Sequence, residues 1–186
     1  MRNKNIFIIA TILLIGLAFF FGSKAGRVSN SKQDTSQILS DTRSAPITLL
    51  NKQAPDFQLT TLDSQQFRLS DKKGKTVILF GMAGWCSTCI PEGRVLTRIK
   101  QEYANKGIEV IGVAFTKGDN DDFLKEFKKV GGIDIPLALD TDNVAQKYNL
   151  TRLETTYIIS KDGKIVYKDE VTTSYEDYKR ELDKII

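Results

Sequence analysis

Apolar residues from position 54 onward fall into two kinds of pattern. The continuous apolar runs at 76–82 and 108–115 are typical of central strands that are covered on both faces. Shorter segments with polar interruptions predict outer strands and hairpins. These segments are a hairpin over 57–69 with its turn at Asp63-Ser64, a strand at 136–139, and a second hairpin formed by 155–159 and 164–167.

Apolar residues also recur at spacings of three and four, as they do on one face of a helix. The helices predicted in this way are 86–103, with Val95, Leu96, Ile99 and Tyr103; 121–132, capped by Asp121, with Phe123, Leu124, Phe127 and Val130; 144–148; and a C-terminal helix with Tyr175, Tyr178, Leu182 and Ile185. Strands and helices thus alternate along the chain. This order predicts an α/β sandwich with a partly parallel sheet.

The first 50 residues have a different character. Arg2 and Lys4 precede an apolar stretch at 6–21, and such basic residues stay on the cytoplasmic side of a membrane. We therefore expect a retained anchor with the body outside the cytoplasm, or a signal peptide cleaved near Ser23–Ala25 and a secreted body. The polar stretch that follows is typical of a flexible linker. The chain divides into an anchor or signal peptide at 1–26, a linker at 27–50 and a folded domain at 51–186.

The formal net charge of +4 belongs to the N-terminal part. From Asn51 onward the chain has 21 Lys and Arg against 21 Asp and Glu, so the domain is formally neutral. It has no run of basic residues interleaved with aromatic residues. Nucleic-acid binding therefore has no electrostatic basis here.

The segment Trp85-Cys86-Ser87-Thr88-Cys89 carries the candidate chemistry, directly after a buried strand and at the start of a predicted helix. A disulfide between cysteines three residues apart closes a very short loop and contributes little stability, which favours a chemical role. The start of a helix favours a thiolate. We expect Cys86 to attack a substrate disulfide and Cys89 to resolve the mixed disulfide. Trp85 is expected to shield one side of the site and to contact substrate.

The same spacing also occurs in zinc sites, which usually have four Cys or His ligands. This chain has no His and no further Cys, so we expect neither a metal nor another cofactor. A Cu(I) ion held by the two thiolates remains an alternative. It would make the protein a copper chaperone.

Several further motifs carry a family resemblance. They are Ala54-Pro55-Asp56-Phe57, Leu69-Ser70-Asp71, Gly74-Lys75, Ile135-Pro136-Leu137, Tyr148-Asn149-Leu150, Thr155-Thr156-Tyr157 and Lys161-Asp162-Gly163-Lys164. With the dithiol motif, they make the domain similar to the TlpA/ResA-like membrane-anchored oxidoreductases of the thioredoxin superfamily. The resemblance implies a thioredoxin-like fold, with a central mixed sheet flanked by helices and an added N-terminal β-hairpin.

The resemblance also implies a function. It indicates a thiol–disulfide oxidoreductase, acting as a reductase on secreted or membrane-associated proteins, with apocytochromes in cytochrome c maturation among the candidate substrates. It implies a redox-active Cys86–Cys89 disulfide and electrons from a membrane thiol transporter of the CcdA/DsbD kind. A peroxiredoxin-type peroxidase is the nearest rival. Its Pro-x-x-x-Thr-x-x-Cys pattern fails at both cysteines, because Leu79 and Ala83 precede Cys86, and Met82 and Cys86 precede Cys89.

Two carboxylates complete the candidate site. Glu92 stands where this branch often has an acidic residue, and it either exchanges a proton with Cys89 or is an exposed first-turn residue. Glu154, before Thr155, occupies the place of the family's cis-proline. A cis bond before a non-proline residue costs about 2.5–4 kcal/mol, so we expect a trans bond and an altered substrate loop. Glu154 then lies near the sulfurs or faces solvent. With Trp85 and Thr155, Glu154 is a candidate substrate-binding residue.

Overall fold

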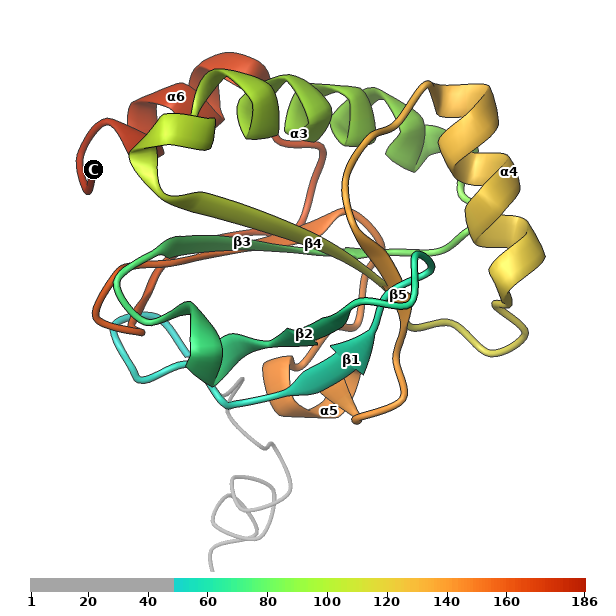
Figure 1. Ribbon diagram of the computed structural model, residues 1–186, viewed down its shortest axis with the longest axis horizontal. Coiled ribbons are helices and arrows are strands. Elements are labelled where there is room, and N and C mark those ends of the chain that lie inside the picture. The colour runs from blue at the N-terminus through green and yellow to red at the C-terminus, as the bar shows by residue number, and fades with distance from the viewer. Residues whose placement is uncertain (1–48) are drawn as a thin grey trace, which may run out of the picture. The chain divides into compact units, whose positions relative to one another are not determined.

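The computed structural model describes residues 49–186, which build a five-stranded mixed sheet (Figure 1). The central strand β3 (Thr76–Met82) runs parallel to β4 (Ile108–Ala114) and antiparallel to β6 (Thr155–Ile159). The strands β5 (Leu137–Leu139) and β7 (Ile165–Asp169) form the two edges. All seven residues of β3 are buried, as its continuous apolar run predicts.

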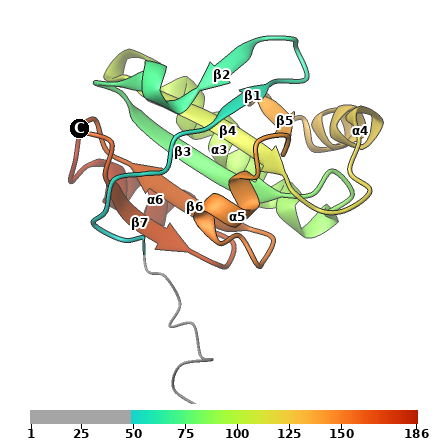
Figure 2. The same cartoon turned by 90° about the horizontal axis from the view of Figure 1, so that it is seen from below.

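Helices and a hairpin cover the two faces of this sheet (Figures 1 and 2). Helices α3 (Ile90–Glu102) and α6 (Tyr175–Leu182) lie on one face. Helix α5 (Val144–Tyr148) lies on the other face, together with the hairpin of β1 (Gln58–Thr60) and β2 (Gln66–Arg68). Each face buries its own apolar cluster. The thioredoxin-like fold and the N-terminal hairpin are thereby confirmed.

The helix expected from Cys86 begins differently. A 3₁₀ turn at Ser87–Cys89 comes first, and α3 begins at Ile90, with Pro91 in its first turn. The first N–H groups of a helix have no intrahelical partner, so a proline there removes no hydrogen bond. Cys86 is therefore the cap of a short 3₁₀ turn and not of a continuous α-helix.

For α4 (Asp121–Gly131), the expected cap is wrong, and so are two of the four positions that were expected to face the core. Asn120, and not Asp121, caps this helix, because its side chain accepts a 3.0 Å hydrogen bond from the N–H of Phe123. Leu124 and Phe127 are buried as expected, whereas Phe123 and Val130 are 43% and 57% exposed. Figure 1 shows α4 beside the sheet and not over it, so the domain covers only a narrow strip of this helix.

Within residues 49–186, no helix combines the length and the apolar character needed to cross a membrane. The expected anchor or signal peptide at 1–26 lies outside the described residues, as does nearly all of the linker expected at 27–50.

Candidate active site

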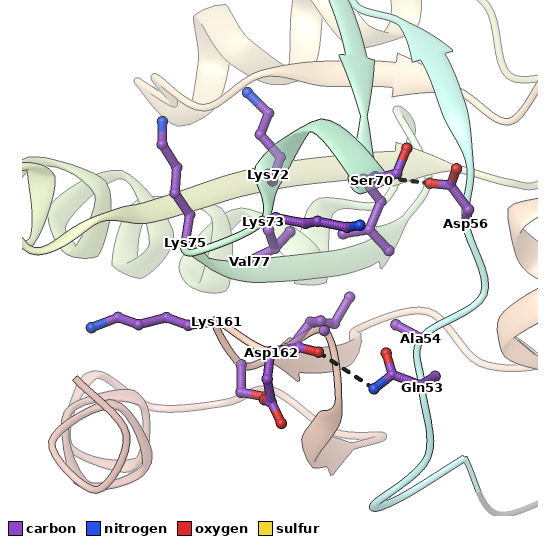
Figure 3. Close-up of a pocket in the computed structure, with 14 residues that line it drawn as sticks. Gln53, Ala54, Asp56, Ser70, Lys72, Lys73, Lys75, Val77, Lys161 and Asp162 are labelled. Carbon is purple, nitrogen blue, oxygen red and sulfur yellow. Dashed lines mark hydrogen bonds between the residues drawn. The ribbon is translucent and has the colours of Figure 1, made fainter.

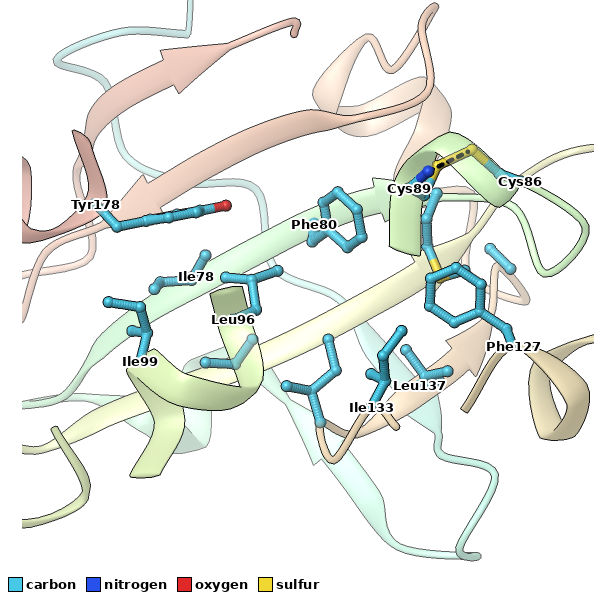
Figure 4. Packing of buried hydrophobic residues seen from close by; sticks show 14 of the residues in the cluster. Ile78, Phe80, Cys86, Cys89, Leu96, Ile99, Phe127, Ile133, Leu137 and Tyr178 are labelled. Atoms are coloured by element: carbon cyan, nitrogen blue, oxygen red, sulfur yellow. Dashed lines mark hydrogen bonds between the residues drawn. A yellow bond between two sulfur atoms is a disulfide. The ribbon is translucent and has the colours of Figure 1, made fainter. Parts of the chain in front are cut away.

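The two cysteines form a disulfide just beyond the C-terminal end of β3. Their Cα atoms are 5.4 Å apart and their sulfurs are bonded at 2.06 Å. Figure 4 shows the pair at one end of the apolar layer that α3 and the sheet enclose. Cys86 is 4% exposed and Cys89 is 0% exposed. Cys86 is the more exposed of the two cysteines, as expected. It is nevertheless less exposed than a residue at the tip of a solvent-exposed helix would be.

The sulfur of Cys86 accepts two hydrogen bonds. The backbone N–H of Cys89 donates at 3.2 Å and the hydroxyl of Thr88 at 3.3 Å. Hydrogen-bond donors and the start of a helical turn both favour a negatively charged sulfur over a neutral thiol. Within this pair, the local geometry therefore favours Cys86 as the thiolate after reduction.

Trp85 is held at the rim of the site by the loop after β4. The side chain is 56% exposed, and its indole N–H donates a 3.0 Å hydrogen bond to the hydroxyl of Thr116. Asp119 fixes this loop, because one carboxylate oxygen accepts from the N–H of Gly84 at 2.8 Å and the other accepts from Thr116. Trp85 is thus an ordered, exposed aromatic side chain next to Cys86.

Sequence reasoning placed Phe123 in the core, whereas the structure places it at the rim of the site. Its backbone lies against Gly84, the residue before Trp85, where an added Cβ would come within 2.7 Å of Phe123 Cβ. Helical periodicity could not reveal this position. The only sequence signal was the glycine itself, since a close backbone approach often requires one.

Glu92 is completely buried, which excludes the exposed first-turn alternative. Its Oε1 accepts hydrogen bonds from the hydroxyls of Thr156 at 2.8 Å and Tyr178 at 2.6 Å. Its Oε2 is buried without a hydrogen-bond partner. The pKa of Glu92 is raised to about 7, mainly by burial and to a smaller extent by the charge of Glu154, while the hydrogen bonds from Tyr178 and Thr156 oppose the rise.

The bond between Leu153 and Glu154 is trans, as expected, since residues 49–186 contain no cis peptide bond. Glu154 adopts a left-handed backbone conformation with φ of 65°. Its N–H donates to the carbonyl of Gly81 at 2.9 Å, and its partly buried carboxylate has one oxygen without a partner. Thr155 is 1% exposed and donates its hydroxyl to the carbonyl of Arg152 at 2.7 Å, so its side chain fixes this loop from inside.

A separate cavity of about 260 Å³ lies at the opposite end of β3 from the disulfide. Four lysines line it, with Lys72, Lys73 and Lys75 on one side and Lys161 on the other (Figure 3). Lys72 and Lys75 both pair with Glu109, at 3.6 and 2.5 Å, whereas Lys73 and Lys161 point in other directions in Figure 3. The four amino groups therefore do not converge on one anion in the cavity. Among the described residues, no group of three or more His, Cys, Asp or Glu side chains is arranged to hold a metal ion.

A central strand that carries a Cys-x-x-Cys disulfide to the start of a helix, on a thioredoxin-like sheet, defines the class of thiol–disulfide oxidoreductases. The Redoxin family model matches residues 49–186. The chain belongs to this family, as a ResA-like thiol–disulfide oxidoreductase of the thioredoxin superfamily.

Named relatives agree with this assignment. The chain is 32% identical over 135 residues to the thioredoxin-like protein YneN of Bacillus subtilis, covering 71% of this chain and 79% of that protein. It is 28% identical over 185 residues to the thiol-disulfide oxidoreductase ResA of Bacillus cereus, covering 99% and 98%.

Solved structures also resemble the domain. A putative protein disulfide isomerase of Bacteroides thetaiotaomicron has a TM-score of 0.63 at 26% identity, over 72% of this chain and 86% of that one. A putative thiol:disulfide interchange protein DsbE of Chlorobium tepidum has a TM-score of 0.64 at 22% identity, over 73% and 96%. The second likeness supports the fold alone.

Proposed function

We propose that this oxidoreductase works outside the cytoplasm and reduces disulfides in other proteins. The observation that carries the proposal is the sulfur of Cys86, which caps a helical turn and accepts hydrogen bonds from the Cys89 N–H and the Thr88 hydroxyl. These donors support Cys86 as the attacking thiolate. Cys89 lies deeper and has no exposed surface, which suits a residue that reacts only with its neighbour.

The reaction transfers two electrons from the dithiol to the substrate. The thiolate of Cys86 attacks one sulfur of the substrate disulfide, forms a mixed disulfide and releases the first substrate thiolate. Cys89 then loses its proton and attacks the sulfur of Cys86. This step forms the Cys86–Cys89 disulfide and releases the second substrate thiolate, so that one disulfide is exchanged for another.

Glu92 is the proposed acceptor of the Cys89 proton. It follows Cys89 by three residues, about one helical turn, and is buried with it beneath the site. A carboxylate whose pKa is raised to about 7 is close to the operating pH, where a general base transfers protons effectively. Glu154 and Trp85 form the proposed substrate side of the site, because Trp85 directly precedes Cys86 and the N–H of Glu154 bonds to the carbonyl of Gly81 near the end of β3.

The proposed location rests on the N-terminal sequence, and the proposed partners rest on the family resemblance of the domain. An apolar stretch at 6–21 after Arg2 and Lys4 supports a single N-terminal membrane pass, with the domain outside. A membrane thiol transporter of the CcdA/DsbD kind would restore the dithiol. Proteins with disulfides outside the cytoplasm would be the substrates, including apocytochromes awaiting haem attachment.

The reduction potential of the Cys86–Cys89 pair tests the direction of the reaction. We expect equilibration with glutathione to give a value nearer that of thioredoxin, about −270 mV, than that of DsbA, about −120 mV. A potential near the oxidising end would reverse the proposed direction. Protease treatment of intact cells that express the full chain tests the location, since a domain outside the cytoplasm would be digested.

A further inference from the structure

The two oxygens of Glu92 have different surroundings. Oε1 accepts hydrogen bonds from two side chains, the hydroxyl of Tyr178 on α6 and the hydroxyl of Thr156 on β6. Oε2 is equally buried and has no hydrogen-bond partner. Tyr178 and Thr156 are themselves 0% exposed, so water does not compete for their hydroxyl groups from the surface.

We propose that Tyr178, together with Thr156, is a positioning residue that occupies Oε1 of Glu92 and thereby makes Oε2 the oxygen that exchanges a proton with the dithiol. The inference rests on the proposed role of Glu92 as proton acceptor. A carboxylate with donors on one oxygen takes its proton on the other, where lone pairs are free. The two hydroxyls also fix the side chain, so that the free oxygen keeps one place on α3, about one helical turn after Cys89.

The number of hydroxyl hydrogens around Glu92 supports the assignment of Oε2 as the oxygen that exchanges the proton. Tyr178 and Thr156 also contact each other at 2.9 Å, so three contacts share only two hydroxyl hydrogens. When Glu92 is ionised, both hydrogens can point to Oε1. When Glu92 carries a proton on Oε2, the hydroxyl of Thr156 can turn to Tyr178. The two hydroxyl hydrogens can therefore reorient when Glu92 gains or loses its proton, and no heavy atom has to move.

The other groups near Glu92 do not provide this fixation. Glu154, on the loop before β6, acts through its charge. The backbone of Thr173 also lowers the pKa of Glu92, but it forms no regular hydrogen bond with the carboxylate. The disulfide precedes α3, with Cys89 three residues before Glu92. Tyr178 is 86 positions from Glu92 in the chain, so the C-terminal helix becomes part of the active site.

The substitution Tyr178→Phe tests the proposal, and Tyr157→Phe is its matched control. Tyr157 is also a buried tyrosine, and its hydroxyl donates at 2.6 Å to the carbonyl of Tyr148. It packs in the apolar cluster on the opposite face of the sheet. Each variant thus loses one buried hydroxyl and a 2.6 Å hydrogen bond that it donates. Only Tyr178→Phe removes a donor from Glu92, together with the 2.9 Å contact to Thr156.

The measurement is the pH dependence of single-turnover reduction of a small disulfide, with the carboxyl ¹³C resonance of Glu92 followed in parallel. Loss of a donor to a charged group should raise the pKa of Glu92 and move the pH midpoint upward by about one pH unit, a tenfold change in proton affinity. Tyr157→Phe should leave the midpoint in place. In a Glu92→Gln background, Tyr178→Phe should cause no further change in the profile.

Thr156 supplies a second test that does not depend on the folding of Tyr178→Phe. Thr156→Val removes the other donor and should also move the midpoint upward, whereas Thr156→Ser keeps a hydroxyl and should restore it. An unmoved midpoint in Tyr178→Phe and Thr156→Val, or equal movement in Tyr157→Phe, would overturn the positioning role. Absence of disulfide exchange in the unmodified protein at any pH would overturn the proposed function itself.

Discussion

Gly84 and Phe123 lie in direct contact at the rim of the disulfide site, although 39 positions separate them in the chain. An added Cβ at Gly84 would lie 2.7 Å from Cβ of Phe123 and 2.9 Å from its carbonyl carbon. The contact seats the first turn of α4 on the loop that carries Trp85 and Cys86. Two exposed aromatic residues, Trp85 and Phe123, therefore belong to segments that meet next to the disulfide.

Phe123→Ser should selectively impair protein substrates. If Phe123 contacts the polypeptide around the substrate disulfide, its loss should lower kcat/KM for a protein substrate about tenfold, as expected for one buried aromatic contact. The rate with a small disulfide should not change. Val130→Ser is the control, because Val130 is exposed on the same helix at the end remote from Gly84. Equal rates for the two variants would contradict a substrate contact at Phe123.

Cys89→Ser should accumulate a mixed disulfide between Cys86 and substrate proteins. The first attack needs only the sulfur of Cys86, and the variant lacks the thiol that would release the substrate. Non-reducing gel electrophoresis followed by reduction measures the trapped complex. Cys86→Ser is the control and should trap little, since Cys89 has no exposed surface. Trapping through the Cys86→Ser variant instead would mean that the two roles are reversed.

Glu92→Gln should change how the stability of the oxidised domain depends on pH. The folded-state pKa of about 7 lies above the ordinary value of 4.5, so the native state binds the Glu92 proton more tightly than the unfolded state. The resulting stabilisation is present below about pH 4.5 and is lost as the pH rises through 7, at most about 3 kcal/mol. Urea unfolding between pH 4.5 and 8 should show this loss in the wild type and not in Glu92→Gln. Parallel curves for both proteins would place the folded-state pKa of Glu92 near its ordinary value.

Glu154→Pro should destabilise the domain, although proline is the family's residue at this place. The ring fixes φ near −65°, whereas Glu154 has φ of +65°, and proline lacks the N–H that bonds to the carbonyl of Gly81. We expect a loss of about 1–3 kcal/mol in the free energy of unfolding. Glu154→Gly is the control, since glycine adopts positive φ readily and keeps the N–H, and its stability should stay close to that of the wild type. A fully stable Glu154→Pro variant would show that the β6 loop adopts the family's conformation at little cost.

Local sequence patterns predicted most of the fold. The apolar run at 76–82 coincides with β3, because a strand buried on both faces needs an unbroken apolar composition. The segment at 155–159 coincides with β6 and pairs with β7, as the predicted hairpin requires. The Cys86–Cys89 pair could equally be predicted from the sequence. Its spacing and its position after a buried strand bring two sulfurs together through local geometry alone, and the disulfide confirms this.

The residues that surround the dithiol could not be predicted from local sequence patterns. Phe123 was assigned to the core and lies exposed beside the site, while Glu92 is fully buried and Tyr178 reaches it from the last helix. Periodicity reports which residues share a face of one helix, but not which neighbour covers that face. The burial of Glu92, and with it the raised pKa, arises from segments far apart in the chain that meet only when β6, α3 and α6 pack together.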